Sequence, residues 1–400
     1  INKYLNFNFI FLFNIGLLGS AEVHKPNILF IFADDQCYET IQSFGLTDIE
    51  TPNLDRLVNS GTSFTRAYNM GSWSGAVCVA SRHMLNTGRF IWEAEKASQK
   101  AEQERESGRF WSEYMKKAGY RTYMTGKWHV RAMAEKCFDV VRNVRGGMPN
   151  QTPEGYNRPL SNQPDPWSPY APYFGGLWKG GKHWSEVVAD DALFFLADAK
   201  KYQKKKPFFA YVAFNAPHDP RQAPESFINK YPLDRIKVPK SFLPEYPYKN
   251  EIKCPHSLRD EKLAPMPRSK HSIKVNRQEY YAIITHMDQQ IGKILDGLKE
   301  SGMEKETYVF FSADHGLGVG HHGLLGKQNL SRKLWNPKKR IYWSLELTRE
   351  YNDNRRNRFP VETTLLILTL MASKLSTYYS TGQLACALGK INDLLMLKLW

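Results

Sequence analysis

The sequence has few cysteines, and none of them forms a closely spaced pair. The five are Cys37, Cys78, Cys137, Cys254 and Cys386, and no C-x-x-C pair occurs. A zinc ribbon needs such pairs and a small disulfide-stabilised scaffold needs a denser set, so both classes are excluded. Each cysteine therefore has to be interpreted from its own surroundings.

The chain also lacks long hydrophobic runs and internal repeats. Of its 400 residues, 42% are hydrophobic and 24% are charged, which excludes a multi-span membrane protein and a wholly disordered chain. At about 150 residues per domain, this length corresponds to two domains or to one large α/β domain with an appendage.

Acidic residues are the minority among the charged ones. The 55 Lys and Arg against 40 Asp and Glu give a net charge of +15, which favours an anionic partner. The segment from Ser331 to Trp400 holds 12 basic and 5 acidic residues, a charge of +7, so the first 330 residues carry +8. Because nearly half of the excess lies in one segment, we do not expect nucleic acid as the partner.

Residues 1–21 have the pattern of an export signal. Lys3 precedes the mostly apolar stretch from Leu5 to Leu18, and Gly19-Ser20-Ala21 supplies small residues for cleavage. The stretch is shorter than the roughly 20 residues that span a bilayer, and a buried first strand or helix is the alternative. We therefore predict a signal peptide, an exported (periplasmic or secreted) protein and no membrane span.

Short apolar runs separated by helical patterns predict an α/β fold with a largely parallel sheet. The predicted buried strands are Asn27 to Ala33, Tyr120 to Thr125, Phe208 to Phe214 and Tyr308 to Ala313, and a helical repeat runs from Tyr281 to Leu298. The Gly-, Pro- and aromatic-rich stretch from Arg145 to Lys182 reads as a long surface loop. Such loops shape binding clefts.

Chemically active side chains follow all four predicted strands. They are Asp34 and Asp35 after the first strand, Lys127 and His129 after the second, His218 after the third, and Asp314 and His315 after the fourth. Parallel strands end at the same edge of a sheet, so these groups are expected to converge in one cleft. Three carboxylates that close to one another need a cation between them. Oxygen ligands favour Ca²⁺, with Mg²⁺ also possible, although the imidazole of His315 prefers softer metals.

The most specific motif is the segment from Cys78 to Arg89, Cys78-Val-Ala-Ser-Arg82-His-Met-Leu-Asn-Thr-Gly-Arg89. It resembles the type I, formylglycine-dependent sulfatase signature C-x-P-S-R-x-x-L-x-T-G-R of the alkaline phosphatase superfamily. Seven of the eight fixed positions match, and Ala80 stands where proline is commonest. The resemblance runs from about His24 to Leu330. The Asp314-His315 pair and the stretch from Ala216 to Arg221 look like the iduronate-sulfatase-like and bacterial polysaccharide-sulfatase branch.

The resemblance implies an alkaline-phosphatase-like three-layer sandwich and a formylglycine formed from Cys78 by a formylglycine-generating enzyme. Hydrated formylglycine would attack sulfur and later expel sulfate through its second hydroxyl, a form of covalent catalysis. Asp34, Asp35, Asp314 and His315 would hold the metal together with the modified Cys78. Arg82 would hold the nucleophile, Lys127 and Lys327 would bind the sulfate, and His129 and His218 would bind sulfate or protonate the leaving alcohol.

The resemblance and the basic charge together favour a sulfated carbohydrate or polysaccharide as the substrate. The Tyr- and Trp-rich loop from Trp167 to Trp184 could stack on sugar rings or could serve in packing. Two alternatives remain: a phosphoryl or phosphonate hydrolase of the same superfamily, and a truncated sulfatase-like protein with impaired activity.

The resemblance ends near Leu330. We predict a signal peptide over 1–21, a catalytic domain over 22–330 and an atypical basic tail over 331–400, where the usual C-terminal subdomain is missing or replaced. The tail shows no pattern expected of the family and contains no histidine. A frameshift and an unusual genuine tail are both open explanations.

Overall fold

The computed structural model describes residues 25–64, 69–160, 162–179, 181–203, 205–327 and 344–346. The predicted signal peptide lies outside these residues, and so does the predicted tail except for Ser344–Glu346. Within them the chain has the predicted α/β architecture with a largely parallel central sheet.

The sheet has seven strands among the described residues, in the order β2-β9-β8-β1-β7-β3-β4. The five strands from β8 to β4 are parallel, whereas β9 runs antiparallel to both β8 and β2. The bounds are β1 Asn27–Ala33, β2 Thr62–Ser63, β3 Arg121–Lys127, β4 Val140–Arg145, β7 Phe208–Ala213, β8 Thr307–Ala313 and β9 Ser344–Glu346. A separate ribbon pairs β5 (Trp178–Lys179) with β6 (Lys182–His183).

The four predicted strands are confirmed as β1, β3, β7 and β8, with ends shifted by at most two residues. The sequence analysis missed β4. This strand lies at the sheet edge and exposes Arg142 and Asn143, so it lacks the continuous apolar run that marks a buried strand.

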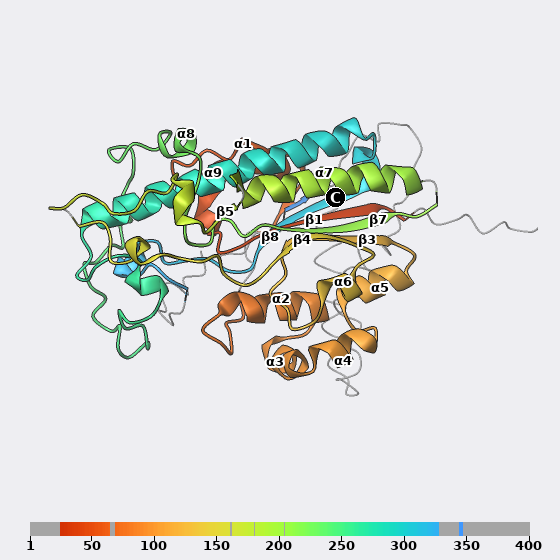
Figure 1. Ribbon diagram of the computed structural model, residues 1–400, viewed down its shortest axis with the longest axis horizontal. Coiled ribbons are helices and arrows are strands. Elements are labelled where there is room, and N and C mark those ends of the chain that lie inside the picture. The colour runs from red at the N-terminus through yellow and green to blue at the C-terminus, as the bar shows by residue number, and fades with distance from the viewer. Residues whose placement is uncertain are drawn as a thin grey trace, which may run out of the picture.

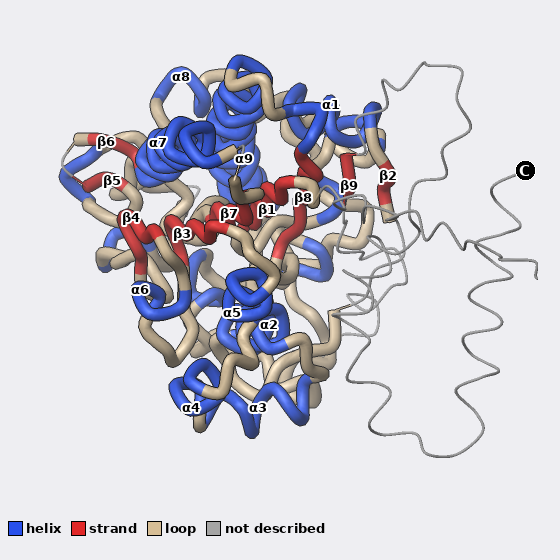
Figure 2. Tube along the Cα trace, turned by 90° about the vertical axis from the view of Figure 1, so that its right-hand side faces the viewer, coloured by secondary structure: helices blue, strands red, loops and turns tan. Residues whose placement is uncertain are grey.

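Helices cover both faces of the sheet, as Figures 1 and 2 show. One layer contains α1 (Pro52–Ser60), α7 (Trp184–Tyr202) and α9 (Lys270–Glu300), with the short α8 (Glu225–Ile228) against α9. The other contains α2 (Val77–Thr87), α3 (Ile91–Gln99), α4 (Ala101–Glu106), α5 (Trp111–Lys117) and α6 (Ala134–Cys137). The predicted helix from Tyr281 to Leu298 is confirmed as the C-terminal part of α9. This helix starts earlier because the Ser269 hydroxyl caps it by accepting the Ser272 N–H.

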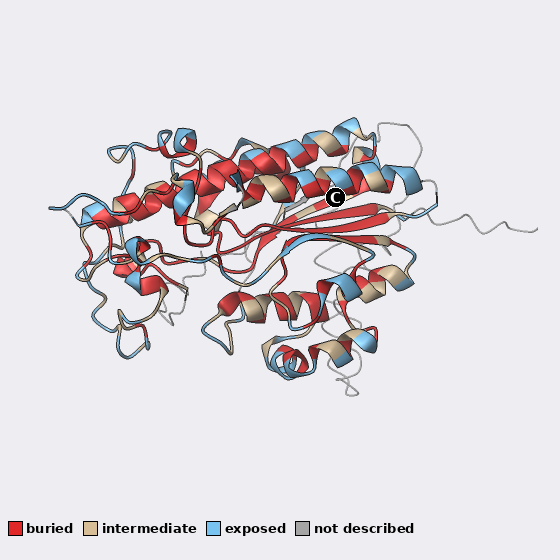
Figure 3. Cartoon of the chain, viewed as in Figure 1, coloured by how far each residue is buried: buried red, intermediate tan, exposed pale blue. Residues whose placement is uncertain are grey.

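The central strand β1 shows why two helical layers are needed. All seven of its residues are buried; Leu29 and Ile31 point into the core beneath α7 and α9, and Phe30 and Phe32 into the opposite core. Burying one such large side chain contributes roughly 1.5–3 kcal/mol. Figure 3 shows the central strands coloured as buried between the two layers.

The long loop predicted between Arg145 and Lys182 is largely irregular, with short 3-10 turns at Pro153–Gly155 and Pro172–Phe174. Trp167 and Phe174 are buried and their rings lie 4.6 Å apart, so these two aromatics serve in packing. Tyr173 remains 81% exposed. No helix in the described ranges combines the length and the apolar character needed to cross a bilayer.

Candidate active site

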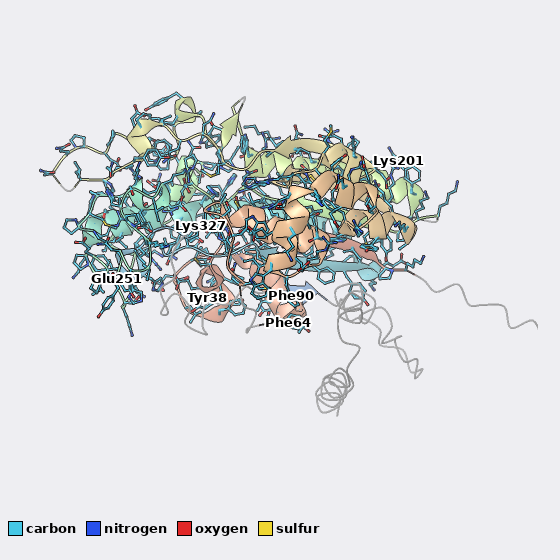
Figure 4. The ribbon with its side chains drawn as sticks, turned by 90° about the horizontal axis from the view of Figure 1, so that it is seen from below. Tyr38, Phe64, Phe90, Lys201, Glu251 and Lys327 are labelled. Carbon is cyan, nitrogen blue, oxygen red and sulfur yellow. The ribbon has the colours of Figure 1, made fainter. Side chains whose placement is uncertain are left out.

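Four of the five parallel strands, β1, β3, β7 and β8, lead into predicted site residues at one edge of the sheet. Asp34 and Asp35 follow β1, Lys127 is the last residue of β3, and Asp314 and His315 follow β8. Every predicted site residue except His129 and Lys327 is classed as buried, and the Lys327 side chain is only 3% exposed. In Figure 4 Lys327 is labelled in the inner part of the view, between Glu251 near one end and Lys201 toward the other.

Gly126 aims the end of β3 into the site. Its φ is +86°, and a β-carbon there would lie 1.8 Å from the backbone oxygen of Ala213 on β7. Only glycine fits such a close approach without moving the neighbouring strand. The β3–β4 register shifts between Thr125 and Gly126, and the next residue, Lys127, forms a buried ion pair with Asp34.

Helix α2 brings Cys78 and Arg82 to the same place from the other layer. Cys78 lies in the first turn of the helix, where the helix dipole favours an anion. Its Sγ is 3.4 Å from Lys127 Nζ and 3.2 Å from His129 Nδ1. Burial lowers the pKa of His129 to about 4, and the charges of Lys127 and Arg82 add to this effect, so this imidazole is neutral at pH 7.

Arg82 is fully buried, and its guanidinium group contacts the backbone, an aromatic ring and two carboxylates. Its Nη1 donates to the Lys127 backbone oxygen at 2.6 Å, and its guanidinium lies 5.0 Å from the Phe32 ring centroid. Its Nη2 lies 3.5 Å from Asp34 Oδ1 and 3.6 Å from Asp314 Oδ2. Burial opposes its charge, but nearby groups, including Asp34 and Asp314, raise the pKa of Arg82 above its ordinary value.

The carboxylates beside Arg82 have the properties of a cation site. Asp34, Cys78, Asp314 and His315 each offer a ligand atom within 4.8 Å of the others. Asp34 Oδ1, Asp314 Oδ2 and His315 Nε2 are buried and take part in no hydrogen bond. Burial and then the neighbouring Asp34 raise the pKa of Asp314 well above its ordinary range. A bound dication would remove this conflict, so the residues fit a divalent metal ion.

A second group of side chains surrounds Lys327. Its Nζ donates to Asp35 Oδ2 at 2.7 Å and to His218 Nε2 at 2.9 Å. His218 Nδ1 lies 2.7 Å from the Asp219 backbone oxygen, which can only accept, so the proton is on Nδ1 and Nε2 is the acceptor. Burial and the Lys327 charge both lower the pKa of His218. His315 Nε2 is 3.1 Å from Asp35 Oδ1.

The structure thus brings together the whole predicted set: Asp34, Asp35, Cys78, Arg82, Lys127, His129, His218, Asp314, His315 and Lys327. The sequence analysis missed three supporting residues. Ser81 Oγ donates to the Asp314 backbone oxygen at 3.0 Å, Tyr280 OH donates to the Asp35 backbone oxygen at 2.6 Å, and Asp219 fixes the His218 tautomer. Ser81 is a fixed position of the Cys78 motif, so it could have been found; Tyr280 lies inside α9 and carried no signal.

Comparison with known proteins agrees with this geometry. The "Sulfatase" family model matches residues 26–366. The chain is 28% identical over 349 residues to an arylsulfatase of Klebsiella aerogenes, covering 75% of this chain and 68% of the relative. It is 22% identical over 369 residues to an N-acetylglucosamine-6-O-sulfatase of Bacteroides thetaiotaomicron, covering 77% of this chain and 61% of the relative.

Among solved structures, a phosphonate monoester hydrolase of Agrobacterium radiobacter matches with a TM-score of 0.56 and 18% identity, over 80% of this chain and 68% of the other. This likeness shows the alkaline-phosphatase-like fold alone. The chain spans about two thirds of the length of these relatives. The family match continues past Leu330 into the predicted tail, where Ser344–Glu346 also joins the sheet as β9; the domain boundary at 330 stays a prediction.

Proposed function

Because the chain belongs to the sulfatase family, we propose that it is an exported sulfuric ester hydrolase that removes sulfate from a sulfated carbohydrate. One observation carries the proposal. The cysteine of the sulfatase signature lies within 3.4 Å of Lys127 Nζ and His129 Nδ1 and beside a buried cluster of carboxylates.

The nucleophile would come from Cys78. In this proposal a formylglycine-generating enzyme converts Cys78 to formylglycine, and its hydrate supplies an oxygen nucleophile at this position. Arg82, fixed by its bond to the Lys127 backbone oxygen, would favour the ionised form of that nucleophile. Lys127 Nζ lies close enough to Cys78 to orient the nucleophile, and the neutral imidazole of His129 lies close enough to accept its proton.

The charge balance of the site suits a sulfate group. Three carboxylates face three basic side chains, Arg82, Lys127 and Lys327, so their formal charges cancel. A Ca²⁺ or Mg²⁺ ion held by Asp34, Asp35, Asp314, His315 and the modified Cys78 would leave an excess of +2 before the nucleophile is ionised and of +1 afterwards. That excess would stabilise the negative charge of the sulfuryl oxygens.

Lys327 and His218 would act on the substrate side of the site. Lys327 carries its charge into the cleft because Asp35, despite burial, raises the pKa of the ammonium group well above its ordinary value. His218 is neutral and presents Nε2 toward Lys327. An arriving sulfate ester would add negative charge, which raises the pKa of His218 and of His129 and lets either protonate the leaving alcohol.

A sulfated carbohydrate is the proposed substrate class. The relative named N-acetylglucosamine-6-O-sulfatase, the stretch from Ala216 to Arg221 and the basic charge of the chain support it. Exposed Tyr173 offers a ring that could stack on a sugar, whereas the buried Trp167 and Phe174 do not.

The test is mass spectrometry of the Cys78 peptide together with hydrolysis assays on sulfated sugars. Conversion of the thiol to formylglycine lowers the mass by about 18 Da, and Cys78→Ala should abolish turnover while leaving the circular dichroism spectrum unchanged. Buried Cys137→Ala, in the α5–α6 core, is the matched control and should stay active. Full activity of Cys78→Ala would refute the mechanism.

The fold match to a phosphonate monoester hydrolase makes phosphonate ester hydrolysis the second candidate. Comparing kcat/KM for a sulfate monoester and for a phosphonate monoester with the same leaving group separates the two activities. A higher value for the sulfate ester is expected. A folded protein that binds Ca²⁺ but hydrolyses neither would fit the impaired-enzyme alternative.

A further inference from the structure

The loop that carries Lys327 is a hairpin extending from the end of β8. Gly318 N donates to the Gly326 oxygen at 2.8 Å, and Gly320 N donates to the Leu324 oxygen at 2.8 Å. Gly323 at the tip has φ +72°, and a β-carbon there would lie 2.2 Å from the Leu243 backbone oxygen. The returning limb, Leu324 to Lys327, ends in the active site.

The buried carboxylate of Glu261 binds the backbone of this returning limb. Glu261, 1% exposed, accepts the backbone N–H of Leu325 at 3.1 Å and that of Gly326 at 2.8 Å. These two amides immediately precede Lys327. The segment with Asp260 and Glu261 packs closely against Gly326: a β-carbon on Gly326 would lie 2.6 Å from Asp260 Cβ and 3.2 Å from Glu261 Oε1.

Arg268 makes this burial of charge tolerable. Its Nη2 donates to Glu261 Oε2 at 2.6 Å, and its Nε donates to the Gly323 backbone oxygen at 3.0 Å. The same guanidinium therefore binds the carboxylate and the tip of the hairpin. The Glu261–Arg268 pair and the two amides form a buried network whose members are hard to replace singly.

Lys327 depends on this anchor for its position. Its Nζ must lie between Asp35 Oδ2, at 2.7 Å, and His218 Nε2, at 2.9 Å. A lysine side chain is flexible and does not fix its own ammonium group, so the ammonium should leave both contacts more often when the backbone that carries it is released.

We infer that Glu261, supported by Arg268, is a positioning residue that holds the Lys327 ammonium group beside Asp35 and His218. Through Lys327 it would strengthen sulfate binding, and this part rests on the function proposed above. Glu261 lies 66 residues before Lys327 in the chain and touches neither the cation site nor Cys78 by any contact seen among the described residues.

The first experiment measures the reactivity of Lys327 toward an amine-acylating reagent, read by mass spectrometry of its peptide. In the wild type the ion-paired, 3% exposed Lys327 side chain should react slowly. Glu261→Gln should raise the rate at least about fivefold, because the released loop opens more often. Glu261→Asp keeps the negative charge opposite Arg268 but moves the carboxylate oxygens away from the two backbone N–H groups. It should raise the acylation rate of Lys327 by a smaller factor, and it serves as the test if Glu261→Gln does not fold.

Asp288→Asn is the matched control. Asp288, 1% exposed, also accepts two successive backbone N–H groups, those of Asn53 at 3.1 Å and Leu54 at 2.7 Å, but at α1. It should lower stability without changing Lys327 labelling. Wild-type labelling in folded Glu261 variants, or equal increases in Asp288→Asn, would overturn the inference.

A kinetic cycle tests the functional part. Glu261→Gln should lower kcat/KM for a sulfate ester about tenfold in the wild-type background but less than about twofold in Lys327→Ala, since the coupled partner is then absent. Equal losses in both backgrounds would mean that Glu261 does not act through Lys327. The labelling experiment does not depend on turnover. An inactive wild-type protein would therefore contradict the proposed function, but the labelling would still show whether Glu261 positions Lys327.

Discussion

At the scale of single residues, the site depends on carboxylates that cannot all be ionised without a cation. Burial would raise the pKa of Asp34, but Lys127, His218 and Arg82 lower it well below its ordinary value, while burial and Asp34 raise the pKa of Asp314. Asp314 Oδ2, like Asp34 Oδ1, is buried without a hydrogen bond, so both oxygens would gain from a bound metal.

Asp314→Asn should therefore weaken cation binding. An amide supplies one neutral oxygen in place of a carboxylate, so the affinity for Ca²⁺ measured by calorimetry should fall at least about tenfold. Asp198→Asn, a carboxylate on α7 paired with Arg121 Nη2 at 2.9 Å, is the control and should bind as the wild type does. Undiminished Ca²⁺ affinity in Asp314→Asn would exclude this cluster as the metal site.

At the scale of elements, the end of β3 sets the position of Lys127. The β-carbon of Gly126→Ala would collide with the Ala213 oxygen at 1.8 Å and would have to adopt φ +86°. We expect this variant to lose several kcal/mol of stability and most of its activity, measured by denaturant unfolding and by kcat/KM. Gly146→Ala, just beyond β4 and with no atom within 4 Å, should change neither; equal effects of the two substitutions would contradict the argument.

The contact of α9 with α1 gives a dependence of stability on pH. Burial raises the pKa of Asp288 from 3.8 to about 6, although hydrogen bonds from Leu54 and Asn53 oppose the shift. A raised pKa means that the stability contributed by Asp288 is fully present below pH 4 and is lost as the pH rises through about 6. The difference amounts to roughly 3 kcal/mol.

Asp288→Asn removes this titration. The free energy of unfolding of the wild type, relative to the variant, should therefore fall between pH 4.5 and pH 7.5, measured by urea denaturation at both values. A relative stability of the wild type that rises over this interval would show that Asp288 is held ionised.

At the scale of the whole molecule, the net charge of +15 should act on association with a polyanion. Added salt screens this attraction over about 10 Å at 0.1 M ionic strength. For a sulfated polysaccharide, kcat/KM should fall several-fold between 20 and 200 mM NaCl, and for a small monosulfate ester it should fall less. Equal salt dependence for both substrates would mean that contacts confined to the cleft dominate binding.

Much of the candidate site was predictable because its residues occur in short sequence patterns. Three of the four buried apolar runs lead into a charged residue, at Asp34, Lys127 and Asp314, and the fourth is followed by His218; the Cys78 motif is specific by itself. The edge strand β4 was missed because Arg142 and Asn143 interrupt its apolar pattern. The supporting roles of Tyr280 and Glu261 were missed. The sequence around a buried polar residue does not indicate which distant residue it will contact.

The sequence by itself determined the class of fold, the candidate reactive groups and their order along the chain, because periodicity and residue type are local properties. Only the tertiary structure decided which groups touch. The turn at Gly126 directs Lys127 to Asp34, and Glu261 holds the two amides before Lys327. Such contacts join residues far apart in the chain, and their distances follow from packing that no single segment contains.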